Sequence, residues 1–415
     1  MQGIVLKTTV SVVKCSDYQP QNVMKAVKEA VDLLGGMAQF VQPGQKVLIK
    51  PNLLSSRPPE SAIDTHPAVI EAVTRLAIEA GGSCRIGDSP ATGVNTLEAY
   101  NRLLKITGMQ DVIDRTGAES VRFDDTGSER EVPNAQVFRR IMLTDAISDA
   151  DFMINVPKLK THALTLITGA IKNLYGCVPG SRKIEFHLQA GDNPEMFAQI
   201  LLNILKVVRP GLSIIDGIIG MDGQGPNAGR RRTFGLIIAG TDPVAIDTVL
   251  CRIAGIDPAI VPMLRMASEQ GIGVSDPAEI QVVGVQPEEV LISDFQLPPQ
   301  ADILNRLPKP LHLMLRNHMI ASPTFLREKC TGCGACANAC PVHAINGRGK
   351  NLNFDYSTCI RCYCCQEVCP QEAIYLRTSR LRSTLEAMIA AQWKVKHYVK
   401  NAIRYLKSAS PSRDG

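Results

Sequence analysis

Residues 330–341 read CTGCGACANACP, and residues 359–370 read CIRCYCCQEVCP. In each run three cysteines are spaced three residues apart, and a fourth follows four residues later, directly before a proline. The second run begins 29 residues after the first. The similarity extends beyond the cysteines, because PVHAI at 341–345 is matched by PQEAI at 370–374. The segment is therefore a duplicated unit.

This spacing is typical of thiolates that bind iron–sulfur clusters. A tight loop can place three sulfurs around one cubane, while the fourth cysteine, before the proline, ligates the other cluster. We therefore predict two 4Fe-4S clusters with crossed ligands. One is assigned to Cys330, Cys333, Cys336 and Cys369, and the other to Cys359, Cys362, Cys365 and Cys340. Zinc is the alternative, but two four-cysteine runs each followed by proline favour iron–sulfur. The segment resembles the bacterial two-cluster ferredoxin domain.

The other cysteines have different interpretations. Of 13 cysteines, four are scattered singly through the first 325 residues, and we expect them to be small buried hydrophobes. Cys364 lies off the repeat and is predicted to be a packing residue, with redox sensitivity left open because it adjoins a ligand. Thiols clustered in one segment of a large chain without a secretion-signal pattern favour metal ligation in a reducing cytoplasm over a disulfide framework.

The composition is that of a globular protein. The chain is 45% apolar and 20% charged, and its length favours two to three domains of about 150 residues each. A net charge of +5 is too small to predict nucleic-acid binding. No apolar run approaches the roughly 18 residues that a membrane-spanning helix needs. We therefore expect a cytoplasmic protein with neither a nucleic-acid partner nor a transmembrane segment.

The chain divides by composition into four parts. Residues 1–295 alternate strand-like and helix-like segments and predict an α/β domain, with a mostly parallel sheet and helices on both faces. A proline-rich connector (296–323) and the ferredoxin-like domain (324–377) follow. Residues 378–408 form a basic amphipathic pattern that predicts a helical tail. This tail would either contact a membrane surface peripherally or pack against the rest of the protein.

Within the first part we expect strands at 46–50, 83–86, 152–156, 212–215 and 234–239, and helices at 67–80, 163–174 and 244–254. Polar residues follow two of these strands: Lys50 and Asn52 after the first, and Asp88 after the second. The carboxyl ends of parallel strands form the ligand crevice of α/β sheets, so we predict that these side chains bind a ligand or cofactor. Ordinary turn formation explains them equally well.

A third strand end carries basic residues. If the chain stays extended after 152–156, Lys158, Lys160 and His162 project to one side, because side chains alternate along a strand. The helix expected at 163–174 would begin beside these side chains. Ammonium groups next to a helix N-terminus suit a phosphate or carboxylate. We predict that these three residues are catalytic and bind an anionic small molecule, with a solvated basic turn as the alternative.

A glycine-rich stretch, residues 216–230, follows the strand at 212–215. Its glycines permit the backbone geometry of an anion-binding loop, although the spacing fits neither a P-loop nor a dinucleotide fingerprint. We select Asp216, Gly223 and Gly225 as candidate cofactor-binding residues. Asp216 and Asp222 are also the candidates for a divalent cation of the magnesium type, or they cap turns.

These motifs carry a family resemblance. The segments KPN (50–52), DTHP (64–67), GDS (87–89), KLKTH (158–162), KN (172–173), DG (216–217) and DPVAID (242–247) resemble the family known as domain of unknown function 362. Members with a ferredoxin segment are uncharacterised iron–sulfur-centre proteins. The resemblance implies an α/β core that binds something at these motifs, and it implies no particular reaction. A fainter likeness links 46–88 to nickel-dependent lactate racemases, at the level of pattern only.

Two classes of function follow. The protein is either an oxidoreductase of anaerobic metabolism, in which the clusters exchange electrons with an anionic ligand in the α/β domain, or a non-catalytic electron carrier or docking protein that recognises a partner. A purely structural role of the clusters is the third option. The size of the α/β part and its polar strand ends favour the oxidoreductase. An electron donor or acceptor protein is implied, and Arg361, Arg377, Arg380 and Arg382 are candidates to receive an acidic donor.

Overall fold

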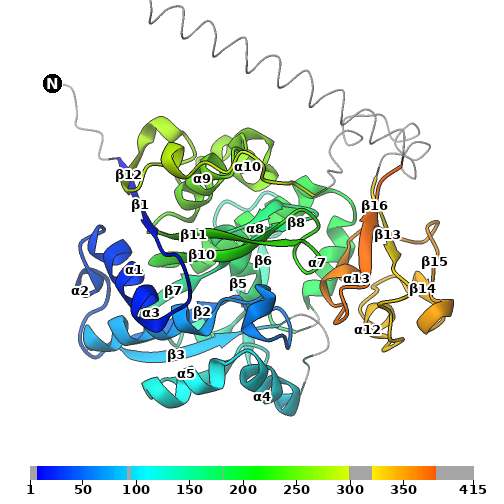
Figure 1. Cartoon of the computed structure of the whole chain (residues 1–415), viewed down its shortest axis with the longest axis horizontal. Coiled ribbons are helices and arrows are strands. Elements are labelled where there is room, and N and C mark those ends of the chain that lie inside the picture. Colours follow the sequence, from blue (N-terminus) through cyan, green and yellow to red (C-terminus); the bar gives the residue numbers. More distant parts are fainter. Residues whose placement is uncertain (1–6, 91–93, 95, 181, 299–319, 380–415) are drawn as a thin grey trace, which may run out of the picture.

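The computed structural model describes residues 7–90, 94, 96–180, 182–298 and 320–379. A large mixed sheet with strand order β12-β1-β11-β10-β7-β2-β3-β4 forms its centre, with β8 pairing to β10 and β9 pairing to β8 (Figure 1). The strands of this sheet are β1 (Thr8–Lys14), β2 (Lys46–Pro51), β3 (Ser83–Asp88), β4 (Glu119–Arg122), β7 (Phe152–Val156), β8 (Lys158–His162), β9 (Leu166–Thr168), β10 (Leu212–Asp222), β11 (Arg230–Gly240) and β12 (Ile280–Gly284).

Most neighbouring strands run parallel, as predicted. Strands β10, β7, β2, β3 and β4 form a continuous parallel series. Strand β11 breaks it, because it runs antiparallel to both β1 and β10. A small separate hairpin joins β5 (Gly127–Glu131) and β6 (Arg140–Thr144). The α/β class predicted from the sequence is confirmed.

Helices cover both faces of the sheet. On one face lie α1 (Pro20–Asp32), α2 (Met37–Phe40), α3 (Pro67–Glu79), α4 (Leu97–Ile106) and α5 (Met109–Thr116), and on the other α6 (Ala170–Asn173), α7 (Arg182–Ala190), α8 (Pro194–Val208), α9 (Pro243–Ile253) and α10 (Pro262–Glu269). Strand β2 shows the division: Val47 and Ile49 join one buried core and Leu48 joins the other, as the alternation of strand side chains requires.

The helix expected at 163–174 is the main error of the sequence prediction. Residues 166–168 form β9, which pairs antiparallel with β8, and helix α6 begins only at Ala170. Thr165, Ile167 and Thr168 are β-branched, which favours the extended conformation. No long helix therefore begins beside Lys158 and Lys160. The glycine-rich stretch also differs from expectation, because β10 continues to Asp222 and the loop covers only 223–229.

The cysteine-rich segment forms a small module at one side of the sheet (Figure 1). Its elements are β13 (Ser322–Phe325), α12 (Ala335–Asn338), β14 (Ile345–Asn346), β15 (Asn353–Phe354), α13 (Cys364–Glu367) and β16 (Ile374–Arg377). Strand β13 pairs with β16, and β14 pairs with β15. Helix α13 lies on the side of the module that faces the α/β part, and α12 lies further out.

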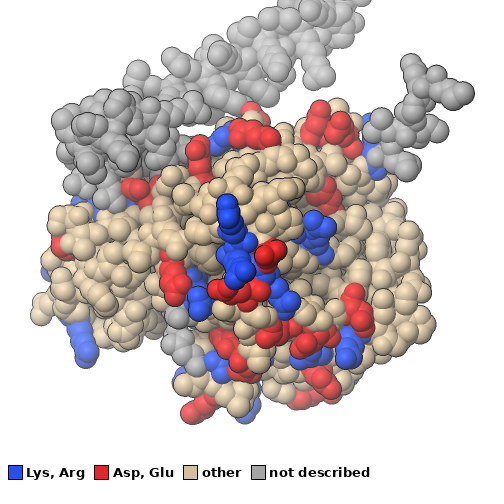
Figure 2. Space-filling model, turned by 180° about the vertical axis from the view of Figure 1, so that it is seen from behind, with Lys and Arg blue, Asp and Glu red and all other residues tan. Residues whose placement is uncertain are grey.

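Most of the predicted connector and of the predicted tail lies outside the residues that the structure describes. Residues 299–319 of the connector and 380–408 of the tail are not among the described residues. Within the described part, no helix combines the length and apolarity needed to cross a membrane. Figure 2 shows that acidic and basic side chains are interspersed over the reverse face of the protein.

Candidate functional site at the contact between the two parts

The structure groups the cysteines of the repeat into two sets. One small cavity of about 20 Å³ is lined by Cys330, Cys333, Cys336 and Cys369, and a second, also of about 20 Å³, by Cys340, Cys359, Cys362 and Cys365. Each set takes three thiols from one half of the repeat and one from the other. This is the crossed grouping that the spacing predicts, and four convergent thiols are the donor set of a cubane cluster.

The glycine-rich loop 223–229 holds the module against the α/β part. Gln224 Nε2 donates to the Leu376 carbonyl (2.9 Å), and the Leu376 amide donates back to Gln224 Oε1 (2.8 Å). The buried Asn227 donates from Nδ2 to the carbonyl of Cys369 (3.0 Å), and it lies within 3.3 Å of the carbonyl of Glu367. The contact thus involves the second half of the repeat.

The amides of this loop serve internal contacts. Gly223 donates to the Gln296 carbonyl (2.7 Å), and Gly225 donates to Thr161 Oγ1 (3.2 Å). Neither glycine lines the main pocket. The amides that an anion would need thus already have partners within the chain, and cofactor binding by Gly223 and Gly225 stays a prediction that this arrangement does not favour.

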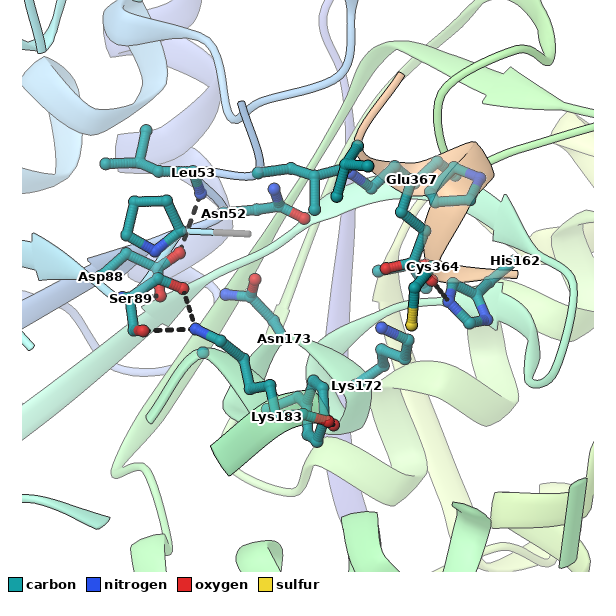
Figure 3. Close-up of a pocket in the computed structure, with 18 of the residues that line it drawn as sticks. Asn52, Leu53, Asp88, Ser89, His162, Lys172, Asn173, Lys183, Cys364 and Glu367 are labelled. Carbon is teal, nitrogen blue, oxygen red and sulfur yellow. Dashed lines mark hydrogen bonds and ion pairs between the residues drawn. The ribbon is translucent and has the colours of Figure 1, made fainter. Parts of the chain in front are cut away.

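The main pocket lies at the carboxyl ends of β2 and β3 and has a volume of about 90 Å³ (Figure 3). A cavity of this size holds several water molecules or a small ligand. Lysines line it from four places in the α/β part, and helix α13 of the cysteine-rich module contributes the opposite wall. The charged lining residues are Lys50, Lys160, Lys172, Lys183, Asp88 and Glu367.

At the β3 end of the pocket the predicted strand-end residues meet. Lys50, with no exposed surface, forms an ion pair with Asp88 (2.7 Å). The amide of Leu53 also donates to Asp88 (2.8 Å), and Asn52 lines the pocket beside them. Lys183 donates to the carbonyl of Ser89 (2.7 Å) and to its hydroxyl, and burial lowers the pKa of Lys183 to about 8.

At the α13 end a histidine contacts the cysteine-rich module. His162 Nε2 lies 2.7 Å from Glu367 Oε1, and His162 Nδ1 accepts from the amide of Leu164 (3.2 Å). Burial lowers the pKa of His162 to about 4, so the ring is neutral at pH 7. Because Nδ1 is an acceptor, the proton belongs on Nε2, and His162 donates to the Glu367 carboxylate.

Several polar groups of the pocket have no partner among the described residues. Lys172 has its ammonium over the rings of Tyr175 (5.3 Å) and Phe197 (5.6 Å), and no carboxylate or carbonyl lies within bonding distance in the described part of the chain. The buried His187 Nδ1 and Thr168 Oγ1 likewise have no hydrogen-bond partner there. A buried polar atom without a partner costs free energy, so His187 and Thr168 need a water or another small molecule in the pocket. The charge of Glu367 acts on Lys172, although the two form no ion pair.

Lys158 belongs to a different, closed cluster. Its ammonium forms an ion pair with Asp216 (2.8 Å) and donates to the Tyr18 hydroxyl (2.7 Å), and neither charged side chain has exposed surface. The His66 amide donates to the same carboxylate oxygen of Asp216, Oδ2 (2.9 Å), and the Tyr18 hydroxyl donates to Oδ1 (2.8 Å). Lys158 and Asp216 do not line the pocket. The structure therefore separates Lys158 from Lys160 and His162, which do line it.

The predicted divalent-cation site is not supported. Asp216 is occupied by Lys158, and Asp222 is paired with Arg230 (2.8 Å) and Arg232 (3.0 Å). Among the described residues, no group of three aspartate, glutamate or histidine side chains is arranged to hold a metal ion.

Several polar residues of the pocket were not selected as site residues from the sequence, although His187 stood out as an isolated candidate acid or base. Lys172, Lys183 and His187 lie on the α/β part, and Cys364 and Glu367 come from α13. Lys172 stands in the KN motif that carries the family resemblance, which is a usable signal. Nothing in the sequence marks Glu367, because its role depends on a contact between residues 205 positions apart.

The paired thiol cavities and the α/β sheet define an iron–sulfur protein with a ferredoxin-like module. Family models agree: "Domain of unknown function (DUF362)" matches residues 47–252, and "4Fe-4S dicluster domain" matches 322–370. The thylakoid-associated protein sll1697 of Synechocystis sp. is 36% identical over 295 residues, which is 70% of this chain and 88% of that protein. The chain belongs to the DUF362 family, and its dicluster domain gives it an iron–sulfur electron-transfer role.

Two solved structures show a weak likeness to this chain. The lactate racemase apoprotein of Thermoanaerobacterium thermosaccharolyticum is 15% identical, with a TM-score of 0.36 over 57% of this chain and 54% of that one. A loganic acid methyltransferase with SAH is 12% identical, with a TM-score of 0.23 over 88% and 93% of the two chains. Neither likeness is strong enough to support a conclusion about the fold or the function of this protein.

Proposed function

We propose that this protein is an iron–sulfur oxidoreductase in which electrons move between two 4Fe-4S clusters and an anionic small molecule held in the pocket. The two sets of four convergent thiols fit two cubane clusters, with Cys340 and Cys369 as the crossed ligands. When bound, such clusters supply one-electron transfer at low potential. The cysteines must be deprotonated to hold them.

The observation that carries the proposal is the shared wall of the pocket. Helix α13 places Cys364 and Glu367 in the lining, and Cys364 stands between the ligands Cys362 and Cys365. A molecule in the pocket would therefore lie against the same short helix that holds the second cluster. No other helix or strand would lie between the second cluster and the bound molecule.

The charge of the pocket favours an anion. Lys50 is neutralised by Asp88 and the carboxylate of Glu367 accepts from His162, whereas Lys172 has no anionic partner within bonding distance among the described residues. Lys160 lines the cavity and donates to the carbonyl of Ile63 (2.7 Å). Burial lowers the pKa of Lys160 to about 7, and the attraction of the buried Asp64 opposes this shift. An anion in the cavity would favour the protonated form. A carboxylate or phosphate would pair with these ammonium groups and satisfy the neutral donors around them.

The alternative, an electron carrier whose α/β part recognises a partner protein, fits this site less well. The pocket is small and closed on one side by the module of the same chain, which suits a small molecule better than a protein surface. We also propose a cytoplasmic location, with peripheral membrane contact through residues 378–408. The word "thylakoid-associated" in the name of the relative favours that contact.

The test is a binding experiment on anaerobically purified protein. We expect about eight iron and eight sulfide per chain, and calorimetric titration with phosphate and with succinate should show binding of at least one of them. Lys172→Gln should weaken it roughly 10-fold or more while leaving the melting temperature nearly unchanged. Lys158→Ala is the contrasting variant, because Lys158 does not line the pocket and its loss should cost about 3–5 kcal/mol of stability by leaving the buried Asp216 carboxylate without a cation.

Two results would contradict the proposal. One is stoichiometric zinc in place of iron. The other is equal affinity of the Lys172→Gln variant and the wild type for every probe that binds, which would place the ligand elsewhere.

A further inference from the structure

The two thiol sets differ in their access to solvent. In the first half of the repeat Cys333 is exposed and Cys330 is half-buried. The repeat equivalent of Cys333 is Cys362, which is buried, and residues 361–367 are all buried where the module meets the α/β part. Cys359 of the second set is half-buried, as Cys330 is, so among the described residues it is the exposed Cys333 that gives the first set the more open approach from outside. Electron transfer between proteins requires such a close approach of the two centres.

Exposed basic residues lie beside this set, one lining its cavity and two directly preceding it in the chain. Arg348 lines the first thiol cavity, and its loop packs against the loop of Cys333: a Cβ on Gly332 would lie 3.0 Å from the Gly349 nitrogen. Arg327 and Lys329 precede Cys330 in the chain, and all three basic side chains are exposed. In the described part of the chain none of the three forms an ion pair. Glu328 is the one acidic residue between them in sequence.

Among the described residues, the second half provides less exposed basic surface. Arg361, which the sequence analysis selected as a receiver of an acidic donor, has no exposed surface and lies over the ring of Tyr356 (5.0 Å). That expectation is wrong, because the loop that contains Arg361 is buried within the protein. Arg377 is exposed, and Arg380 and Arg382 lie outside the described residues.

We infer that the surface formed by Arg327, Lys329 and Arg348 around Cys333 is the docking site of an acidic one-electron carrier protein. The inference rests on the proposed function in one respect, the cluster at the first thiol set. In each encounter one electron leaves the reduced carrier and enters the module there. The carrier is oxidised by one electron, the module is reduced by one, and no bond or proton is involved. Unpaired basic side chains at the point of entry steer a negatively charged surface into place.

The test is stopped-flow reduction of the anaerobic holoprotein by a reduced plant-type [2Fe–2S] ferredoxin, an acidic one-electron donor, at low ionic strength. Charge reversal in Arg327→Glu/Lys329→Glu/Arg348→Glu should lower the second-order rate constant roughly 10- to 100-fold and remove most of its salt dependence. Calorimetric affinity for the oxidised ferredoxin should fall in parallel. The matched control reverses three exposed basic residues on α1 and α4, Lys25, Arg102 and Lys105, and should change the rate no more than about twofold.

The outcomes separate this inference from the proposed function, because the readout needs no pocket ligand. Full reduction of the docking variant by excess dithionite shows that its clusters are intact. If it loses iron, the neutral variant Arg327→Gln/Lys329→Gln/Arg348→Gln replaces it, with an expected fall of about fivefold. Equal rates for the docking variant and the wild type, or an equal fall in the control, overturn the inference.

Discussion

The two halves of the cysteine repeat share their ligand spacing, yet they face different surroundings. The first half lies toward solvent, whereas the second half lies against the α/β part and lines its pocket. The residues between the ligands account for the difference. Small or neutral residues of the first half correspond, 29 positions later, to larger or reactive ones: Gly332 to Arg361, Ala335 to Cys364, Ala337 to Gln366 and Asn338 to Glu367.

This divergence teaches that the duplication preserved cluster binding while the intervening positions specialised. In the second half Glu367 contacts His162, Gln366 donates to the carbonyl of Gln224 (3.1 Å), and Cys364 lines the pocket. The equivalent residues of the first half make no such contacts within the described structure. This asymmetry fits the proposal that one half receives electrons and the other half faces the ligand.

Crossed ligation gives the largest expected effect. Cys340→Ser should remove the cluster held mainly by the second half, and Cys369→Ser the one held mainly by the first half, each with loss of about four of eight iron atoms. Iron analysis and electron paramagnetic resonance (EPR) of the reduced proteins check this. If each variant loses the cluster of its own half, the two halves are independent units.

The second-largest effect is expected from weakening the contact between the second half of the repeat and the α/β part. Asn227→Ala removes a buried donor to carbonyl groups of α13 and the residues after it, which should cost about 1–3 kcal/mol and increase hydrogen exchange in the module. Asn338→Ala, at the exposed position of the first half that corresponds to Glu367, is the control and should stay within about 0.5 kcal/mol. Equal effects of the two substitutions would remove the asymmetry.

The pH dependence of ligand binding gives the smallest effect. Lys183 lies at the β3 end of the pocket, and burial lowers its pKa to about 8, opposed by the nearby carboxylates of Asp124 and Asp88. Above that pH it loses its charge, so affinity for phosphate or succinate should fall by up to about tenfold at pH 9. His162 and His187, with pKa values of about 4, stay neutral between pH 7 and pH 9.

The control for this profile is Lys183→Arg, whose guanidinium stays charged and should flatten the decline. Lys160, whose pKa burial also lowers, is present in both proteins, so the difference between the two profiles isolates Lys183. A variant with the same decline as the wild type would assign the titration to another group.

The sequence predicted what local spacing determines. The cysteine sets followed from the regular spacing of the repeat, and the α/β class followed from the alternation of strand-like and helix-like segments. The partners of the basic residues on β8 could not be predicted from the sequence. Side chains on this one strand contact different parts of the protein. Lys158 meets Tyr18 and Asp216, whereas His162 meets Glu367 in the other part of the protein. Such partners are set by tertiary packing, which a single sequence does not display.

The glycine-rich loop is a second feature whose role could not be predicted from the sequence alone. Its composition fits an anion-binding loop and equally a loop that packs closely against another backbone. A Cβ on Gly225 would lie 2.3 Å from the carbonyl oxygen of Thr161, so close packing is the reason for glycine at this position.

The most direct test of electron transfer between the clusters and the pocket is an anaerobic reductive titration followed by EPR. It compares the protein with and without the small molecule that the purified protein releases on heating, identified by mass spectrometry. We predict that the reduced clusters are reoxidised only when this molecule is present, that its reduced form accumulates in proportion to the electrons lost, and that Cys340→Ser abolishes the reaction. Clusters that stay reduced beside the bound molecule, or full conversion by the Cys340→Ser variant, would contradict the account.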